Sequence, residues 1–135
     1  MYRLMVNHEL NTESKILEAA IHAFLLFGYH GIKLHVIADK AGVNRAALYY
    51  YFRSKEKLYK NVAEKVFGIF FSSKSQIIPS SERLEEIRWF FYTELYNNKE
   101  LFEKTLKELY PDVWDRNLSD IKNWIGNTST QLPTP

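Results

Sequence analysis

Apolar residues recur along this chain at spacings of three and four, which is the spacing of one face of an α-helix. Between residues 12 and 27 the apolar face consists of Ile16, Ala19, Ala20, Ala23, Phe24 and Phe27. Asn11 or Thr12 can cap the start of this helix, and Gly28 supplies a left-handed residue that ends it. The periodicity therefore predicts a first helix from about residue 12 to residue 27.

Three further helices are predicted before residue 72. A short second helix closes at Gly42, and its apolar positions are Leu34, Ile37, Ala38 and Ala41. A third helix begins at the N-cap residue Asn44 and ends at about Tyr51. Ser54 caps a longer fourth helix, whose apolar face is Leu58, Val62, Val66 and Ile69.

The C-terminal half shows the same helical period. The serine-rich segment 72–81, which contains Pro79, is predicted to be a connection. A helix over 82–96 follows, Asn97 and Asn98 interrupt it, and a second helix continues until Pro111 stops it. A last, weaker helix is predicted around Trp114, Leu118, Ile121, Trp124 and Ile125. Strand signals are weak throughout, so the fold class is predicted to be all-α.

The second and third helices meet at a very tight connection. Ala38 is small where two helices approach each other, Gly42 can adopt a positive φ at the corner, and Leu48 is apolar where the pair packs on the first helix. This spacing is typical of a helix-turn-helix, in which the second helix lies in the DNA major groove. A tight helical corner that does not bind DNA has the same spacing, so the motif alone leaves both interpretations open.

The distribution of charge along the chain supports the interpretation as a DNA-binding helix-turn-helix. The chain has a formal net charge of only +2. Residues 40–60, however, contain six basic residues and a single acidic residue, Glu56, which gives this segment a charge of 6 − 1 = +5. Such a window is typical of a phosphate-facing surface, although a solvated lysine-rich helix has the same composition.

The composition excludes several other classes. The chain has no cysteine, which rules out disulfides, thiolate metal sites and cysteine nucleophiles. Its longest apolar run, residues 66–71, is too short to span a membrane, and the N-terminus lacks the features of a signal peptide, so we expect a cytoplasmic protein. The four histidines share no metal-ligand spacing, and no catalytic motif is visible. We therefore expect neither an enzyme nor a bound cofactor.

Contiguous motifs over residues 12–60 resemble the DNA-binding domain of TetR-type transcriptional regulators. They are Ile16-Leu-Glu-Ala-Ala20, Phe27-Gly-Tyr29, Ile37-Ala38, Ala41-Gly-Val43 and Leu48-Tyr-Tyr-Tyr-Phe-Arg-Ser-Lys-Glu-Lys-Leu58. The resemblance implies a homodimer that binds a palindromic operator in double-stranded DNA, as a repressor released by a small molecule. It also implies a domain order: a helix-turn-helix domain over 1–54 and a shortened helical effector and dimerisation domain over 55–125. The polar residues 126–135 are predicted to form a disordered tail.

The resemblance assigns roles to individual residues. The base-contacting positions are Asn44, Arg45, Ala46, Ala47 and His35. Among them Arg45 is the best candidate for bidentate recognition of guanine. The phosphate-contacting positions are Lys33, Tyr49, Tyr51 and Lys55, whereas Tyr50 and Phe52 are expected to pack inward with Leu48. A solvated arginine and two helix-packing tyrosines are the alternatives for Arg45, Tyr49 and Tyr51.

The start of the second helix departs from the family pattern. The family has Ser or Thr there, and this chain has Ile32-Lys33-Leu34. Lys33 can replace the phosphate contact with a point charge, but the side-chain cap is lost, and Gly31 adds freedom to the connection. We therefore expect the second helix to fray at its start.

The second half carries no family motif after about residue 70. Trp89, Phe90, Tyr92, Tyr96 and Phe102 are candidates to line an effector pocket, and ordinary core packing is the alternative for each of them. The resemblance places the dimer interface in this half. The short C-terminal half and the altered second helix keep another function open: a helical protein-interaction module that retains the fold without regulated operator binding.

Overall fold

The computed structural model describes the backbone of residues 2–71 and 80–114, and side chains over 12–68 and 80–112. The described secondary-structure elements are helices, and the chain divides into two compact units at Val62 and Ala63, inside one helix. The predicted domain boundary after residue 54 precedes this division. The predicted tail over 126–135 and most of the last predicted helix lie outside the described residues.

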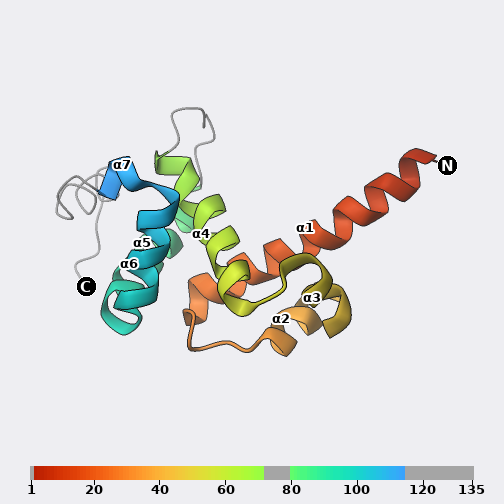
Figure 1. Ribbon diagram of the computed structural model, residues 1–135, viewed down its shortest axis with the longest axis horizontal. Coiled ribbons are helices and arrows are strands. Elements are labelled where there is room, and N and C mark those ends of the chain that lie inside the picture. The colour runs from red at the N-terminus through yellow and green to blue at the C-terminus, as the bar shows by residue number, and fades with distance from the viewer. Residues whose placement is uncertain (1, 72–79, 115–135) are drawn as a thin grey trace. The chain divides into compact units, whose positions relative to one another are not determined.

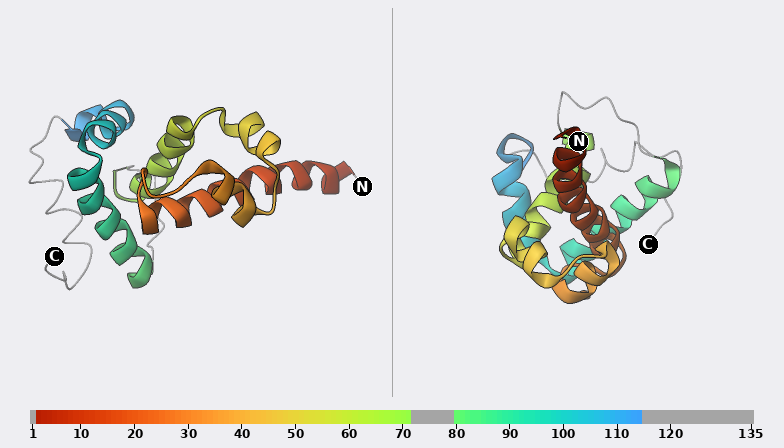
Figure 2. Two further views of the ribbon diagram at one scale, coloured as in Figure 1. Left: turned by 90° about the horizontal axis from the view of Figure 1, so that it is seen from below. Right: turned by 90° about the vertical axis from the view of Figure 1, so that its right-hand side faces the viewer.

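The first unit is a bundle of short helices packed on one long helix (Figure 1). Its elements are α1 (Tyr2–Phe27), α2 (Leu34–Ala41), α3 (Arg45–Phe52) and the first part of α4 (Lys55–Phe71). The first turns of α1 extend beyond α2 and α3 (Figures 1 and 2). The predicted cap at Asn11 or Thr12 is wrong, because α1 is continuous through both positions and no Gly or Pro interrupts residues 2–27.

The core of the first unit follows the predicted apolar stripes. Each helix contributes fully or almost fully buried residues, among them Ile16, Phe24, Ile37, Ala38, Leu48, Phe52, Leu58 and Tyr59. Leu48 and Phe52 are four residues apart on α3, which places both on the face toward the core. Tyr50 lies on the opposite face and is 70% exposed, so the prediction that it packs inward is wrong, whereas the prediction for Phe52 is confirmed.

The glycines predicted to end helices do so at α1 and α2 of the first unit. Gly28 has φ 75° and its N–H donates to the Phe24 carbonyl, which ends α1. Gly42 has φ 72° and ψ 31°, and the Val43 N–H reaches back to the Ala38 carbonyl at 3.0 Å. This arrangement satisfies the last carbonyls of α2 and starts the tight turn into α3.

The second unit comprises the end of α4, α5 (Ser81–Asn97), α6 (Lys99–Leu109) and the short α7 (Pro111–Trp114). α5 and α6 are joined at Asn98 and packed against each other (Figure 2). Four phenylalanines form the centre of this unit, with ring centroids 5.5 to 6.1 Å apart: Phe67, Phe90, Phe91 and Phe102. The predicted break at Asn98 and the stop at Pro111 are confirmed.

Tyr110, between α6 and α7, connects the end of α6 to α4 through a hydrogen bond. Its hydroxyl donates to the Glu64 carbonyl at 3.0 Å. Burial, and to a smaller extent the Glu64 charge, raises the pKa of Tyr110 to about 12.

Candidate nucleic-acid interface

The N-terminus of α3 is fixed by its own first residues. Asn44 has extended backbone angles, and its Oδ1 accepts a hydrogen bond from the Ala47 N–H at 2.8 Å. This cap satisfies one of the free N–H groups that begin a helix. Since Leu48 faces the core, the exposed positions of the first turn are Arg45 and Ala46.

An open hollow of about 300 Å³ lies where α2, α3 and α4 begin. Its lining residues are Lys33, Leu34, His35, Arg45, Leu48, Tyr49 and Lys55. Three of these side chains are cationic, and none of them is acidic. Cationic groups and a tyrosine hydroxyl around an open surface can take a phosphate of a nucleic-acid backbone, which supplies most of the affinity of such complexes.

Lys55 is held at the edge of this hollow by an aromatic cluster. Its Nζ lies 4.5 Å from the centroid of the Tyr29 ring, a cation–π contact. Tyr29 in turn contacts Tyr59 edge to face at 5.0 Å and stacks on Phe24 at 6.3 Å. Burial, and to a smaller extent the nearby Glu56, raises the pKa of Tyr29. The ring therefore stays neutral at physiological pH and presents a packed face to the ammonium group.

Capping at the start of α4 agrees with the prediction. The Ser54 Oγ accepts a hydrogen bond from the Lys57 N–H at 3.1 Å. α2 lacks such a cap, as predicted: Lys33 occupies the N-cap position and makes no side-chain cap. The Lys33 carbonyl nevertheless accepts from the N–H groups of Val36 and Ile37 at 3.0 and 3.3 Å, so α2 begins directly at Leu34. Fraying of α2 stays a prediction.

The structure brings together part of the predicted set of nine DNA-contacting residues. The five that line the hollow are Lys33, His35, Arg45, Tyr49 and Lys55. The other four do not line it: Asn44 caps α3, Ala46 is exposed, Ala47 is half-buried, and Tyr51 packs edge to face on Tyr50 at 5.0 Å. The contacts of all nine residues with DNA stay predictions.

The five candidates for an effector pocket are spread over different faces. Phe90 and Phe102 are fully buried and in contact, with ring centroids 5.8 Å apart. Trp89 and Tyr96 are exposed by 59% and 88%, and Tyr92 is half-buried. Adjacent residues of a helix point about 100° apart, so Trp89 and Phe90 cannot share one environment. Their role in ligand binding stays a prediction.

Two features near the interface had no signal in the sequence. Arg53, between α3 and α4, has φ 63° and ψ −45°, and the Phe52 carbonyl accepts from the Ser54 N–H across it, which defines a γ-turn. Gly31, between α1 and α2, lies so close to the end of α1 that an added Cβ would be 2.1 Å from the Phe27 carbonyl oxygen. Both depend on backbone geometry rather than on a residue pattern.

The arrangement of α1, α2 and α3 is that of a helix-turn-helix domain. Residues 16–62 match the family model described as "Bacterial regulatory proteins, tetR family". This segment is therefore similar to the helix-turn-helix domain of that family, and further helices follow it.

Several regulators are similar to this chain. The HTH-type transcriptional regulator RutR of Escherichia coli K12 is 48% identical over 54 residues, which cover 40% of this chain and 26% of RutR. The HTH-type transcriptional repressor NicS of Pseudomonas putida is 35% identical over 66 residues, 49% of this chain and 31% of NicS. The biofilm operon icaADBC HTH-type negative transcriptional regulator IcaR of Staphylococcus epidermidis is 25% identical over 120 residues, 89% of this chain and 64% of IcaR. The chain thus spans about a quarter of the length of RutR.

Within the described ranges, none of the helices combines the length and apolar character needed to cross a lipid bilayer.

Proposed function

We propose that this chain is a sequence-specific DNA-binding transcriptional regulator. It acts as a homodimer on a palindromic operator, as a repressor that a small molecule releases. The observation that carries the proposal is the hollow at the starts of α2, α3 and α4, where Lys33, Arg45 and Lys55 lie with no acidic neighbour in the lining. The family match over residues 16–62 and the regulators similar to this chain support the same function.

The proposal divides the work between two kinds of contact. Lys33, Tyr49 and Lys55 bind backbone phosphates and fix the position of the domain on the duplex. Arg45, exposed at the start of α3, reads a guanine through O6 and N7 in the major groove. Asn44 supports this geometry from within, because its cap orients the first turn of α3.

Selection of binding sites from random duplex DNA at near-physiological salt tests the proposal. We expect an enriched motif with two-fold symmetry and half-sites about one helical turn apart. A lone half-site would contradict the homodimer but not the reading of DNA. A folded chain that enriches no sequence would contradict the proposal and favour the protein-interaction module.

Two substitutions separate the roles of the lining residues. Arg45→Ala should weaken specific binding by about 1 to 3 kcal/mol and relax the preference at one base pair. Lys55→Ala should weaken binding to all sequences alike and reduce the salt dependence by about one unit. Titration of labelled duplexes at several salt concentrations measures both effects.

Lys65→Ala is the matched control, because Lys65 is exposed on α4 and belongs to the second unit. It removes the same charge and should leave the base preference unchanged. Unaltered base preference in Arg45→Ala would show that this residue reads no base.

A further inference from the structure

The second unit contains a buried arginine whose terminal nitrogens lack a hydrogen-bond partner in the part of the chain that the structure describes. Arg88 on α5 is 3% exposed. Its terminal nitrogens Nη1 and Nη2 have almost no accessible surface and make no hydrogen bond to any residue within 12–68 or 80–112, whose side chains the structure describes. Within three and four residues along α5, the only acid is Glu85, whose side chain is exposed and forms no ion pair with Arg88.

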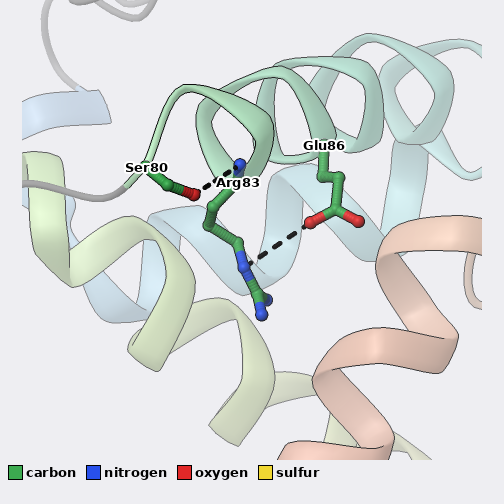
Figure 3. A network of polar contacts seen from close by, with 3 residues as sticks. All are labelled: Ser80, Arg83 and Glu86. Carbon is green, nitrogen blue, oxygen red and sulfur yellow. Dashed lines mark hydrogen bonds and ion pairs between the residues drawn. The ribbon is translucent and has the colours of Figure 1, made fainter.

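A second arginine on the same helix shows the contrast. Arg83 Nε lies 3.5 Å from the Glu86 Oε1, and both side chains are about one-third exposed (Figure 3). The backbone N–H of Arg83 donates to the Ser80 Oγ, so this residue belongs to the cap of α5 as well. Arg83 therefore has its charge balanced at the surface, whereas the terminal nitrogens of Arg88 are inaccessible to solvent and have no hydrogen-bond partner among the described residues.

A buried, unpaired guanidinium is unfavourable for folding. Arginine stays protonated in proteins, so it cannot lose its charge as a buried lysine can. Removal of such a charge from water without an opposite charge or hydrogen-bond acceptors costs several kcal/mol. The folded unit is therefore more stable in any state in which an anion reaches Nη1 and Nη2.

We propose that Arg88 anchors a binding site for a small organic monocarboxylate with an apolar body. The two terminal nitrogens of a guanidinium match the two oxygens of a carboxylate in one plane. One negative charge neutralises Arg88, while the neighbouring residues on the buried face of α5, Ile87 and Phe91, offer only apolar surface.

The buried residues described around Arg88 offer no second cation to a more highly charged ligand. Glu94 is 2% exposed on the same helix, six residues further on, which is roughly 9 Å along the axis. Its Oε1 accepts from the Asn98 side chain at 3.3 Å. Arg88 is the only cation among the described buried residues, so a second negative charge on the ligand would have no buried cation to neutralise it, and a monocarboxylate fits better than a phosphate.

This binding does not require that the chain bind DNA. Under the proposed function the carboxylate is the effector, but the site consists of residues of the second unit and does not depend on that function. Because Nη1 and Nη2 are covered, the side chains over them must move before the ligand reaches them.

Thermal unfolding of the full chain with benzoate as the probe tests the site. Benzamide, which has the same shape without the charge, and inorganic phosphate are the matched ligands. We expect benzoate at tenfold its Kd to raise Tm by about 4 °C, with no comparable rise from the other two. An equal rise with benzamide, or none with benzoate, would overturn the proposal.

Variants then assign the effect to Arg88. Arg88→Met removes the charge at similar length, and should abolish the benzoate response while leaving the Tm of the free protein unchanged or higher. Arg83→Met, on the same helix, should keep the full response. If Arg88→Met responded to benzoate as the native chain does, the proposal would be overturned. It would also be overturned if the native chain gave no benzoate response and Arg88→Met had a much lower Tm, because Arg88 would then bind an acceptor within the protein.

If Arg88→Met fails to fold, Arg88→Lys tests whether Arg88 binds the carboxylate. It keeps the charge but replaces the planar pair of donors with one ammonium group. We expect benzoate to bind severalfold more weakly to this variant, and equal binding would overturn the proposal. Since the readout needs no DNA, its failure is distinct from a failure of the operator selection.

Discussion

Gly31 shows how a single residue can depend on space that the sequence does not reveal. From the sequence it only adds freedom to the connection between α1 and α2. In the structure its Cα faces the last carbonyl of α1, and a Cβ would be 2.1 Å from the Phe27 oxygen. That atom belongs to the backbone, so it cannot move aside as a flexible side chain can.

Gly31→Ala should lower the free energy of unfolding by about 2 kcal/mol, since the connection must shift to admit a methyl group. Urea denaturation measures the change. Gly42→Ala is the comparison, because Gly42 has φ 72° but no atom within 4 Å of its added Cβ. It should cost only the strain of the left-handed conformation, about 1 kcal/mol. A Gly31→Ala protein as stable as the native one would contradict the steric argument.

Single residues were predictable where one local interaction decides their role. Asn44 and Ser54 are caps because a short polar side chain precedes an apolar period, and both caps are present. Tyr50 was assigned to the wrong face because three adjacent tyrosines carry no pattern. Arg88 gave no signal, since only the folded unit decides which face of α5 is buried.

At the scale of elements, the junction of α3 and α4 is the most constrained. Arg53 occupies φ 63° and ψ −45°, a region that residues with a Cβ rarely adopt. The γ-turn at this residue lets α4 begin immediately after α3, which brings Lys55 to the hollow next to Arg45. Strain at one exposed residue thus shapes the candidate interface.

Arg53→Gly should raise the free energy of unfolding by about 1 kcal/mol, because relief of backbone strain exceeds the greater freedom of glycine in the unfolded chain. Guanidinium denaturation at neutral pH tests this. Arg53→Ala keeps the Cβ and should be close to neutral. Destabilisation by the glycine would show that the side chain of Arg53, rather than the turn, supports the junction.

The helices were predictable where capping or helix-ending residues mark their limits. α2 to α6 begin and end close to the predicted residues, because Gly42, Asn44, Ser54, Asn98 and Pro111 mark their limits. The start of α1 was not predictable from a cap, since Asn11 and Thr12 are equally compatible with a helix interior. Nor does periodicity alone place the division between the units inside α4.

At the scale of the whole molecule, each unit contains a tyrosine whose pKa is raised by burial: Tyr29 in the first and Tyr110 in the second. An unfolded tyrosine ionises near pH 10, and Tyr110 in the folded chain near pH 12. Between these values the unfolded state binds fewer protons than the folded state. The contribution of Tyr110 to stability is therefore present below pH 10 and is lost as the pH rises toward 12.

The free energy of unfolding should fall between pH 10 and pH 12. The slope from Tyr110 should be less than about 1.4 kcal/mol per pH unit, because the group is only partly buried and water screens it. Tyr110→Phe removes the hydrogen bond to the Glu64 carbonyl, which should cost about 1 kcal/mol at pH 8, and should make the alkaline fall shallower. Urea denaturation at pH 8, 10 and 11 compares the two proteins, and equal slopes would contradict the assignment to Tyr110.

The helix-turn-helix half was more predictable than the rest of the molecule. A helix-turn-helix constrains small, apolar and cationic residues at fixed spacings, and those spacings are visible in residues 16–62. The second half has no such constraint: its aromatic residues are divided between a core and a surface by helix rotation, as Phe90 and Trp89 show.

The position of Lys55 over Tyr29 has a consequence for the free energy of association. A free lysine side chain loses about 2 kcal/mol of rotamer entropy when it is fixed on a ligand. Here the aromatic ring already restricts the ammonium group in the unbound protein. Part of that ordering is completed when the chain folds. Under the proposed function, less entropy then remains to be lost when Lys55 binds a phosphate, so the side chain is preorganised for that contact.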